Sequence, residues 1–406
     1  MGDMYLAWAK DKGLEQKGES GGAVSAILKS LLESGRVDAV LTAKARNGNR
    51  YDGIPVVITK PEEVAETAGA LHCFSGNLAR CLKEYLDGAL QMKLAVVGRP
   101  CDTRAIIEIG KRNKIKLDNL VLIGLNCTGT LPASSAKKMF AEEFGVNPDD
   151  VVRDDIDDGK LKIWLKDGSE KEMELADLEK KGYGRRENCQ RCDVNIPTMA
   201  DLACGKWGAE EKNATFIEVC SSKGAEVMEA VIKGGFLRTE EPSKKAIDKR
   251  KQKDEQAIAD AQKTQERDFS EYHNMAIDDR FAFWKEQFNQ CIKCYGCRDA
   301  CPICYCDECV LQPNRELIPA GVIPPGWMFS MIRVFHVADS CINCGQCQDT
   351  CPMSLPLSRL IFMLNREIDE TLNYEPGVDT EQKPPLVTFD QEEVLLEEVK
   401  LSAQPD

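Results

Sequence analysis

Apolar residues in the first part of the chain follow two alternating periods. Between residues 21 and 35 they recur every three or four positions, which predicts an amphipathic helix that stops at Gly35. Four short apolar runs, "VDAVLTA", "IPVVIT", "KLAVVG" and "NLVLIGL", predict strands. Helices are expected between them over 61–69, 76–87 and 102–112. Strands that alternate with helices predict an α/β fold around a mostly parallel or mixed sheet.

Local signals add detail to this region. Thr59, Pro61 and Glu62 have the spacing of a capping box, with proline at the first helical position. The Asp-Gly pair at 167–168 predicts the turn of a β-hairpin. The stretch "ATFIEVCSSKGAEVMEAVIKGG" then predicts a strand, a helix and a glycine stop. Residues 1–237 are therefore expected to form one α/β domain.

The remainder of the chain divides into three parts. Residues 238–286 are highly charged and weakly periodic, which indicates a solvated helical linker rather than a binding face. Cysteines are concentrated in residues 287–365. Residues 366–406 are acidic and interrupted by prolines, which favours a tail that lies along the surface or is disordered.

Charge and cysteine usage restrict the function classes. The net charge of −14 argues against binding to nucleic acid or to anionic lipid, because both need clustered basic residues. The chain shows no signal peptide and no apolar run long enough to span a membrane, so we expect a cytoplasmic protein. Disulfides are rare in that compartment, and the nineteen cysteines are better interpreted as metal ligands.

The pattern C-x2-C-x2-C-x3-C-P occurs twice, from Cys291 and from Cys341. Thiolates suit iron–sulfur clusters or zinc, but zinc usually takes paired C-x2-C units without the following proline. The pattern therefore favours two 4Fe-4S clusters, with the fourth cysteine of each run binding the cluster of the other run. The predicted ligands are Cys291, Cys294, Cys297 and Cys351 for one cluster, and Cys341, Cys344, Cys347 and Cys301 for the second.

Two helical faces accompany these runs, one in "WMFSMIRVFHVA" and one over 357–364. With them, residues 287–365 resemble the mainly helical two-cluster ferredoxin module of heterodisulfide reductase and succinate dehydrogenase type subunits. His336 is either a ligand or, more commonly for a lone histidine, a packed side chain. Three further cysteines hold another cluster, bind zinc with a fourth donor, or line a reduced core; these are Cys304, Cys306 and Cys309.

Cysteines in the α/β region lie at predicted strand ends or in loops with glycine, where such folds place their sites. They occur in "VVGRPC" (96–101), "GLNC" (124–127) and "CQRCDVNIPTMADLACGKWG" (189–208). The C-x2-C pair alone is a weak metal signal. With Cys101 and Cys127 at the ends of neighbouring strands, a site of four thiolates becomes geometrically reasonable.

These three stretches, in this order, resemble the flavin-containing beta subunit family of deazaflavin-dependent hydrogenases and formate dehydrogenases. The similarity covers residues 20–237, and the ferredoxin block at the C-terminal end is more similar to the formate dehydrogenase members. The resemblance implies one FAD and a third 4Fe-4S cluster. It implies Cys101, Cys127, Cys189 and Cys192 as cluster ligands, with Cys204 as a substitute for Cys101; Cys204 and Cys220 depart from the family's usual residues.

The flavin site is less marked in the sequence, because a G-x-G-x-x-G fingerprint is absent. Gly21, Gly22 and Ser25 stand at the start of a predicted helix, where backbone N–H groups bind phosphate or the glycines merely form a turn. His72, in a second loop with glycine, and Gly98 complete the candidate flavin contacts.

The resemblance also implies a path for electrons. A partner alpha subunit with molybdenum or tungsten would oxidise formate, since a chain with three histidines shows no formate-oxidising site of its own. Electrons would pass through the 4Fe-4S clusters to FAD and on to coenzyme F420, an 8-hydroxy-5-deazaflavin, with the cofactors performing the chemistry. The alternatives are a beta subunit of an F420-reducing hydrogenase, or a non-catalytic conduit between a dehydrogenase and heterodisulfide reductase.

Overall fold

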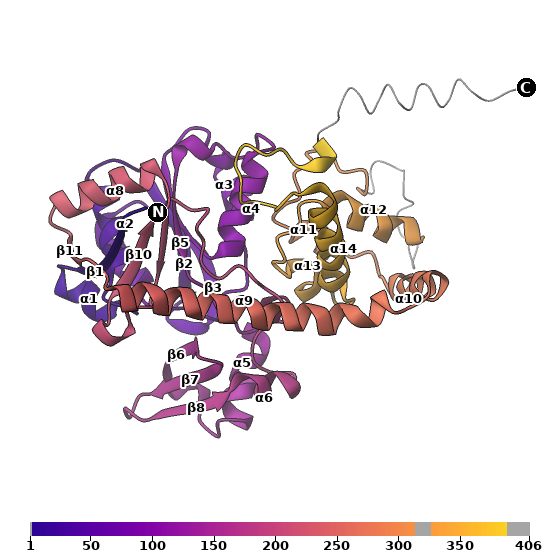
Figure 1. The fold of residues 1–406 in the computed structure, drawn as a ribbon, viewed down its shortest axis with the longest axis horizontal. Coiled ribbons are helices and arrows are strands. Elements are labelled where there is room, and N and C mark those ends of the chain that lie inside the picture. Colours follow the sequence, from indigo (N-terminus) through magenta and orange to yellow (C-terminus); the bar gives the residue numbers. More distant parts are fainter. Residues whose placement is uncertain (1, 313–325, 388–406) are drawn as a thin grey trace, which may run out of the picture.

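An eight-stranded mixed sheet forms the centre of the larger part of the protein (Figure 1). The structure is a computed structural model and describes residues 2–312 and 326–387. Across the sheet the strands are β11 (Leu237–Glu240), β1 (Met4–Ala9), β10 (Thr215–Val219), β9 (Leu202–Gly205), β5 (Leu120–Leu125), β4 (Leu94–Gly98), β2 (Ala39–Arg46) and β3 (Asn49–Ile58). Neighbours among β2, β4, β5 and β9 are parallel, whereas the outer pairings are antiparallel. The expectation of parallel strands therefore holds for the centre of a mixed sheet.

Helices cover both faces of this sheet. Helices α1 (Lys12–Lys17), α2 (Ala23–Glu33) and α8 (Ser222–Lys233) share one core with it, and α3 (Leu78–Tyr85) and α4 (Pro100–Gly110) share the other. Side chains of β4 alternate between these cores, as the pleat of a strand requires. A strand buried on both faces explains why "KLAVVG" is apolar at every position after its lysine.

One predicted helix has a different form. Residues Pro61–Thr67 make a 3-10 helix whose preceding residue is Lys60, and no side chain caps it. The capping box assigned to Thr59 is therefore wrong, although proline does stand at the first helical position. The other expected helices of this region are confirmed as α2, α3 and α4.

A small antiparallel sheet lies beside the main one (Figure 1). It consists of β6 (Val151–Asp157), β7 (Lys160–Leu165) and β8 (Glu170–Glu174), and helices α5 (Ala133–Glu142) and α6 (Leu175–Lys180) pack on it. The hairpin turn at 167–168 is confirmed, with Gly168 at a positive φ of 84°. This unit contributes one wall of the candidate site.

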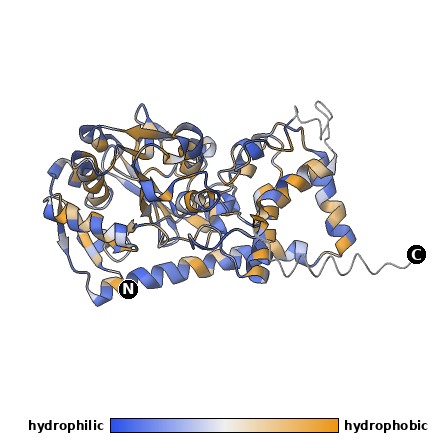
Figure 2. Cartoon of the chain, turned by 90° about the horizontal axis from the view of Figure 1, so that it is seen from above, coloured by the Kyte–Doolittle hydropathy of each residue, from blue (hydrophilic) through white to orange (hydrophobic). Residues whose placement is uncertain are grey.

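The charged segment after the sheet forms a helix of 30 residues, α9 (Lys244–His273), followed by α10 (Ile277–Asn289). Figure 2 shows α9 as mostly hydrophilic with scattered hydrophobic positions. Arg250, Ala261, Phe269 and Tyr272 are nevertheless buried. The expectation of a solvated segment is thus wrong for one face of α9, which packs along both parts of the protein.

In the described part of the cysteine-rich block, four α-helices lie among loops. They are α11 (Gly296–Asp299), α12 (Trp327–Ala338), α13 (Gln346–Asp349) and α14 (Leu357–Leu372). Apolar residues of this block share one continuous core with α3 and α4. Residues 373–379 then return to α4, where the Tyr374 hydroxyl lies 2.7 Å from a carboxylate oxygen of the fully buried Glu108. None of the described helices combines the length and apolarity needed to cross a bilayer.

Candidate redox centres and flavin cavity

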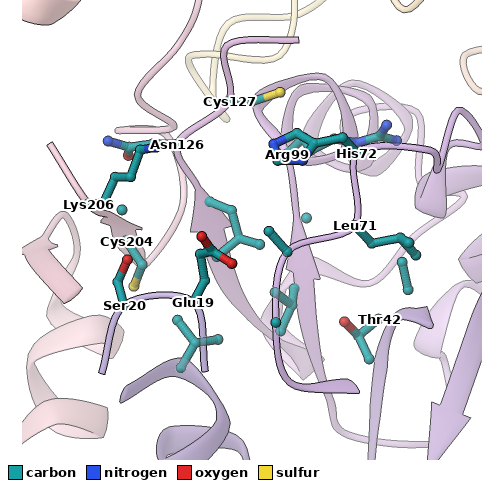
Figure 3. Close-up of a pocket in the computed structure, with 18 of the residues that line it drawn as sticks. Glu19, Ser20, Thr42, Leu71, His72, Arg99, Asn126, Cys127, Cys204 and Lys206 are labelled. Atoms are coloured by element: carbon teal, nitrogen blue, oxygen red, sulfur yellow. The ribbon is translucent and has the colours of Figure 1, made fainter. Parts of the chain in front are cut away.

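A cavity of about 280 Å³ opens at the carboxyl ends of the parallel strands β4, β5 and β9. This is where α/β sheets bind ligands. Figure 3 shows Asn126, Lys206 and Cys204 on one side of it and Leu71, His72 and Arg99 on the other. Four of the predicted flavin contacts line the cavity, namely Gly22, Ser25, His72 and Gly98.

The N-terminus of α2 forms one wall because two glycines adopt left-handed backbone. Gly21 and Gly22 have φ of 72° and 69°, which favours glycine. A Cβ on Gly22 would lie 2.2 Å from the carbonyl oxygen of Leu14, and one on Gly21 would meet Trp8. Gly21 is not among the lining residues, so its part is to form the turn. The free N–H groups of the eleven-residue α2 suit a phosphate.

Arg99 fixes the opposite wall. Its backbone N–H and its side chain both donate to Asp102, at 2.9 Å and 2.8 Å, at the start of α4. Its guanidinium also donates to the carbonyl oxygens of Phe74 and Gly76 and lies over the Phe74 ring. The loop that carries His72 is thereby held over the cavity.

A set of four cysteines lies directly behind this cavity. Cys101 begins α4, Cys127 follows β5, and Cys189 and Cys192 lie in and after α7 (Glu187–Gln190). The pKa of each of the Cys101, Cys127 and Cys192 thiols is raised to about 12, chiefly by burial, and the charge of Cys189 contributes to each rise. These neighbours are the four predicted ligands. Because Cys127 also lines the cavity, a cluster here would adjoin a bound flavin.

Cys204 lies apart from this set. It is fully buried on β9, and its charged neighbours are Arg250 and Cys220. The structure therefore does not bring Cys204 into the position of a substitute ligand. Its backbone carbonyl instead accepts a hydrogen bond from Asn126 N, beside the cavity.

Cysteines of the two repeated runs lie near one another, and the crossed ligand sets stay a prediction. Burial is the largest cause of the raised pKa of Cys291, and the charges of Cys351 and Cys294 raise it as well. Cys351, the fourth cysteine of the second run, therefore lies near the first run. Reciprocally, Cys301 raises the pKa of three buried thiols of the second run, Cys341, Cys344 and Cys347. Cys297 completes the first set, with Cys291 and Cys294 as neighbours.

A buried arginine lies between these two sets. Arg333 of α12 is 3% exposed, and its guanidinium donates to the carbonyl oxygen of Cys297 at 2.9 Å. Its Nε is buried and makes no hydrogen bond within the described part of the chain. Although burial disfavours its charge, the nearby Cys301, Cys304 and Cys297 raise its pKa. A buried cation needs a compensating negative charge. Anionic iron–thiolate clusters on both sides would supply that charge, so the donor set fits them.

A polar clasp joins the two halves of the protein. Asn188 donates to the carbonyl oxygen of Asn343 at 3.0 Å, and Asn343 donates to that of Asn188 at 2.9 Å. Arg186 donates to the carbonyl oxygen of Cys344 at 2.8 Å and pairs with Asp349. Since Asn188 adjoins Cys189, the clasp places the cysteine set behind the cavity next to the second set of the cysteine-rich block.

The remaining cysteines of the block lie near the first run and near basic side chains. Cys304 lies against Cys301, which raises its pKa, and Lys83 donates to its carbonyl oxygen at 2.7 Å. Cys309 neighbours Cys306 and Arg298. Among the described residues, no three histidine, cysteine, aspartate or glutamate side chains converge to hold one metal ion. Zinc at Cys304, Cys306 and Cys309 stays a prediction. A 4Fe-4S cube holds its ligands further apart, since four irons lie between them.

Several site residues carry no recognisable signal in the sequence. Arg99, Arg186 and Arg333 match no motif, and the burial of Arg186 and Arg333 depends on contacts between distant segments. Lys206 pairs with Asp155 at the cavity wall, but a lysine in a loop rarely indicates a site. His336 is exposed on α12 and lies outside the four-cysteine sets.

Comparison with known proteins supplies independent findings. Family models of the coenzyme F420 hydrogenase/dehydrogenase beta subunit match residues 4–83 (N-term) and 91–245 (C terminus). The F420-dependent formate dehydrogenase subunit beta of Methanocaldococcus jannaschii is 45% identical over 386 residues, covering 95% of this chain and 99% of the relative. The F420-dependent formate dehydrogenase 1 subunit beta of Methanococcus maripaludis is 44% identical, covering 95% and 97%. A chain of the F420-reducing [NiFe] hydrogenase complex from Methanosarcina barkeri has a similar fold, with a TM-score of 0.57 and 20% identity over 66% of this chain and 92% of that one.

Proposed function

The chain belongs to the coenzyme F420 hydrogenase/dehydrogenase beta subunit family, and on that premise we propose that it is the electron-transferring beta subunit of an F420-dependent formate dehydrogenase. One observation carries the proposal beyond the family. Cys127 lines the cavity, the Asn188–Asn343 clasp ties its neighbourhood to the cysteine-rich block, and Arg333 lies beside Cys297 within that block, which supports a row of redox centres. Such a row suits an oxidoreductase subunit that moves electrons over a distance.

The three cysteine sets hold 4Fe-4S clusters in this proposal, and the cavity holds FAD. Cys127 and its three neighbours place one cluster beside the flavin. The clasp of Asn188 and Asn343 keeps the next cluster close, and Arg333 stabilises charge on the two clusters of the cysteine-rich block. The cytoplasm, which keeps thiols reduced, suits nineteen free cysteines.

FAD would supply the exchange between single electrons and hydride, since a flavin accepts both and a deazaflavin accepts hydride. The protein's residues bind and orient the two rings. The α2 N-terminus receives phosphate, Arg99 holds the loop over the ring, and apolar Leu71 and Val97 exclude water. A molybdenum or tungsten alpha subunit would oxidise formate and deliver electrons to the cysteine-rich block.

Two other functions compete with this one. A hydrogenase beta subunit is disfavoured because the formate dehydrogenase relatives align with 95% of the chain, whereas the chain from the hydrogenase complex covers 66% of it. A conduit toward heterodisulfide reductase would use the same redox centres, but it would not require a cavity for a deazaflavin beside Cys127. We therefore place deazaflavin reduction on this chain.

A dye-driven assay tests the proposal. The complex purified without oxygen is mixed with a reduced one-electron dye and coenzyme F420, and the loss of deazaflavin absorbance is followed. We expect reduction that stops when the flavin is removed and returns when FAD is added. A flavin-loaded complex that never reduces the deazaflavin would support the conduit instead. Formate-dependent reduction by the same preparation distinguishes a formate-oxidising partner from a hydrogenase.

A further inference from the structure

His72 lies at the cavity with a carboxylate behind it. Its Nδ1 is 2.9 Å from Oδ2 of Asp154, a residue of β6 that is 2% exposed. The other carboxylate oxygen of Asp154 contacts Arg50 of β3. Nδ1 and Asp154 Oδ2 are buried without an aligned hydrogen bond, and such contacts often tighten when a ligand binds. Since Nδ1 faces Asp154 and the ring lines the cavity, Nε2 is the nitrogen available to a ligand.

We propose that His72 carries protons between solvent and the reacting rings in this cavity, with Asp154 as the residue that orients it. This role rests on the proposed function. Reduction of a deazaflavin adds two electrons and two protons, as one hydride at carbon and one proton at nitrogen. The electrons come from the iron–sulfur sites, whereas both protons come from water. His72 takes a proton from water at Nε2 when the flavin is reduced and holds it until hydride leaves for the deazaflavin. It then gives this proton to the nitrogen of the deazaflavin and returns to its neutral form, so atoms and charge balance.

The charges around His72 suit this cycle. In the empty cavity, burial lowers its pKa to about 4, and Lys206, Arg50 and Arg153 lower it as well. Asp155 raises it, and Asp154 lies at Nδ1. His72 is therefore neutral near pH 7, which leaves a lone pair on Nε2 when Asp154 favours the proton on Nδ1. Arg99, Asp102 and Glu19 are the other charged residues that line the cavity.

Negative charge that arrives in the cavity changes this balance. An anion within a few ångströms raises the pKa of a histidine by about one to three units. Two electrons on a bound ring would supply that charge, so His72 takes up a proton when the ring is reduced. Proton uptake that follows reduction makes the potential of the ring depend more steeply on pH.

The test is the midpoint potential of the bound flavin in the complex, measured against pH. Each proton taken up with two electrons adds about 30 mV per pH unit. We expect the parent to show this additional slope between the two pKa values of His72. His72→Asn retains a donor at the Nδ1 position for Asp154 but lacks Nε2, and His72→Gln places an amide that cannot accept the proton. Both variants should lose the additional slope.

His273→Gln is the matched control, because this histidine lies on α9 at 48% exposure and 3.5 Å from Glu367. It should keep the slope of the parent. Equal slopes in the parent and in both His72 variants, with flavin bound and deazaflavin still reduced, would overturn the role of His72 alone. A parent complex without flavin would overturn the proposed function and this role with it.

Discussion

Replacement of Arg333 by methionine should lower the reduction potentials of the two clusters in the cysteine-rich block. Methionine has a similar length and removes the positive charge that lies between the two cysteine sets. Addition of an electron to either cluster would then lose the attraction of a buried cation. Arg333→Lys retains a charge and provides the control, although it loses the planar contact with the carbonyl oxygen of Cys297.

The size of the effect follows from Coulomb's law. At a separation of about 6 Å and an effective dielectric constant of about 20, one charge attracts one electron by about 3 kcal/mol. Since about 1.4 kcal/mol corresponds to about 59 mV for one electron, the upper bound is about 120 mV. Because the added electron is shared among the atoms of the cluster, its attraction to the cation is weaker than this upper bound. We therefore expect the cluster potentials to shift by about 50 to 100 mV toward more negative values.

A reductive titration followed by electron paramagnetic resonance measures these potentials in the intact complex. Arg333→Met should shift two cluster signals, while the cluster behind the cavity and the flavin keep theirs. The cluster potentials of Arg333→Lys should differ from those of the parent by less than about a third of the shift that Arg333→Met causes. Unchanged potentials in the methionine variant, at full cluster content, would refute the assignment of Arg333 as the charge shared by two clusters.

Three further predictions concern other parts of the structure. Cys127→Ser should remove about four irons per chain, whereas Cys204→Ser should retain them in the same iron analysis; equal iron in both would contradict the ligand assignment. Gly345→Ala should slow reduction of the flavin by the cysteine-rich block in stopped-flow absorbance, because Gly345 has φ of 73° and a Cβ would lie 2.2 Å from Asn188 Oδ1; an unaltered rate would argue against the clasp. Burial opposes ionisation of Glu108, yet Lys111 and Arg112 lower its pKa, so its stabilisation is present above the unfolded pKa of about 4.3 and is lost as pH falls through the folded pKa. The difference in Tm between the parent and Glu108→Gln should therefore be largest near neutral pH and shrink below about pH 4, and a difference constant with pH would count against this reasoning.

Local sequence predicts the centre of the fold well. The runs that become β4 and β5 are apolar at nearly every position, because both faces of these strands are covered. The exchange of Cys301 and Cys351 between the two sets is a prediction from the spacing within each run, and the structure brings each of them near a thiol of the other run. Such features depend on neighbours in the chain, so the sequence carries them directly.

Contacts between distant segments are what the sequence does not reveal. β1 pairs with β10 and β11, more than 200 positions later, which makes the outer sheet antiparallel. Arg186 and Arg333 are buried by partners from the other half of the chain or the other run. Arg250 belongs to the highly charged helix α9, yet its side chain is buried and pairs with Glu218 of β10. The charge of residues 238–286 predicts a solvated segment, whereas tertiary packing buries Arg250.

The most direct test of the account measures iron, acid-labile sulfide, zinc and flavin in one sample of the complex purified without oxygen, corrected for the partner subunit. The account predicts one FAD and about twelve irons with about twelve sulfides assigned to this chain, from three 4Fe-4S clusters. A colourless preparation without sulfide or flavin, or cysteines occupied by zinc, would contradict it.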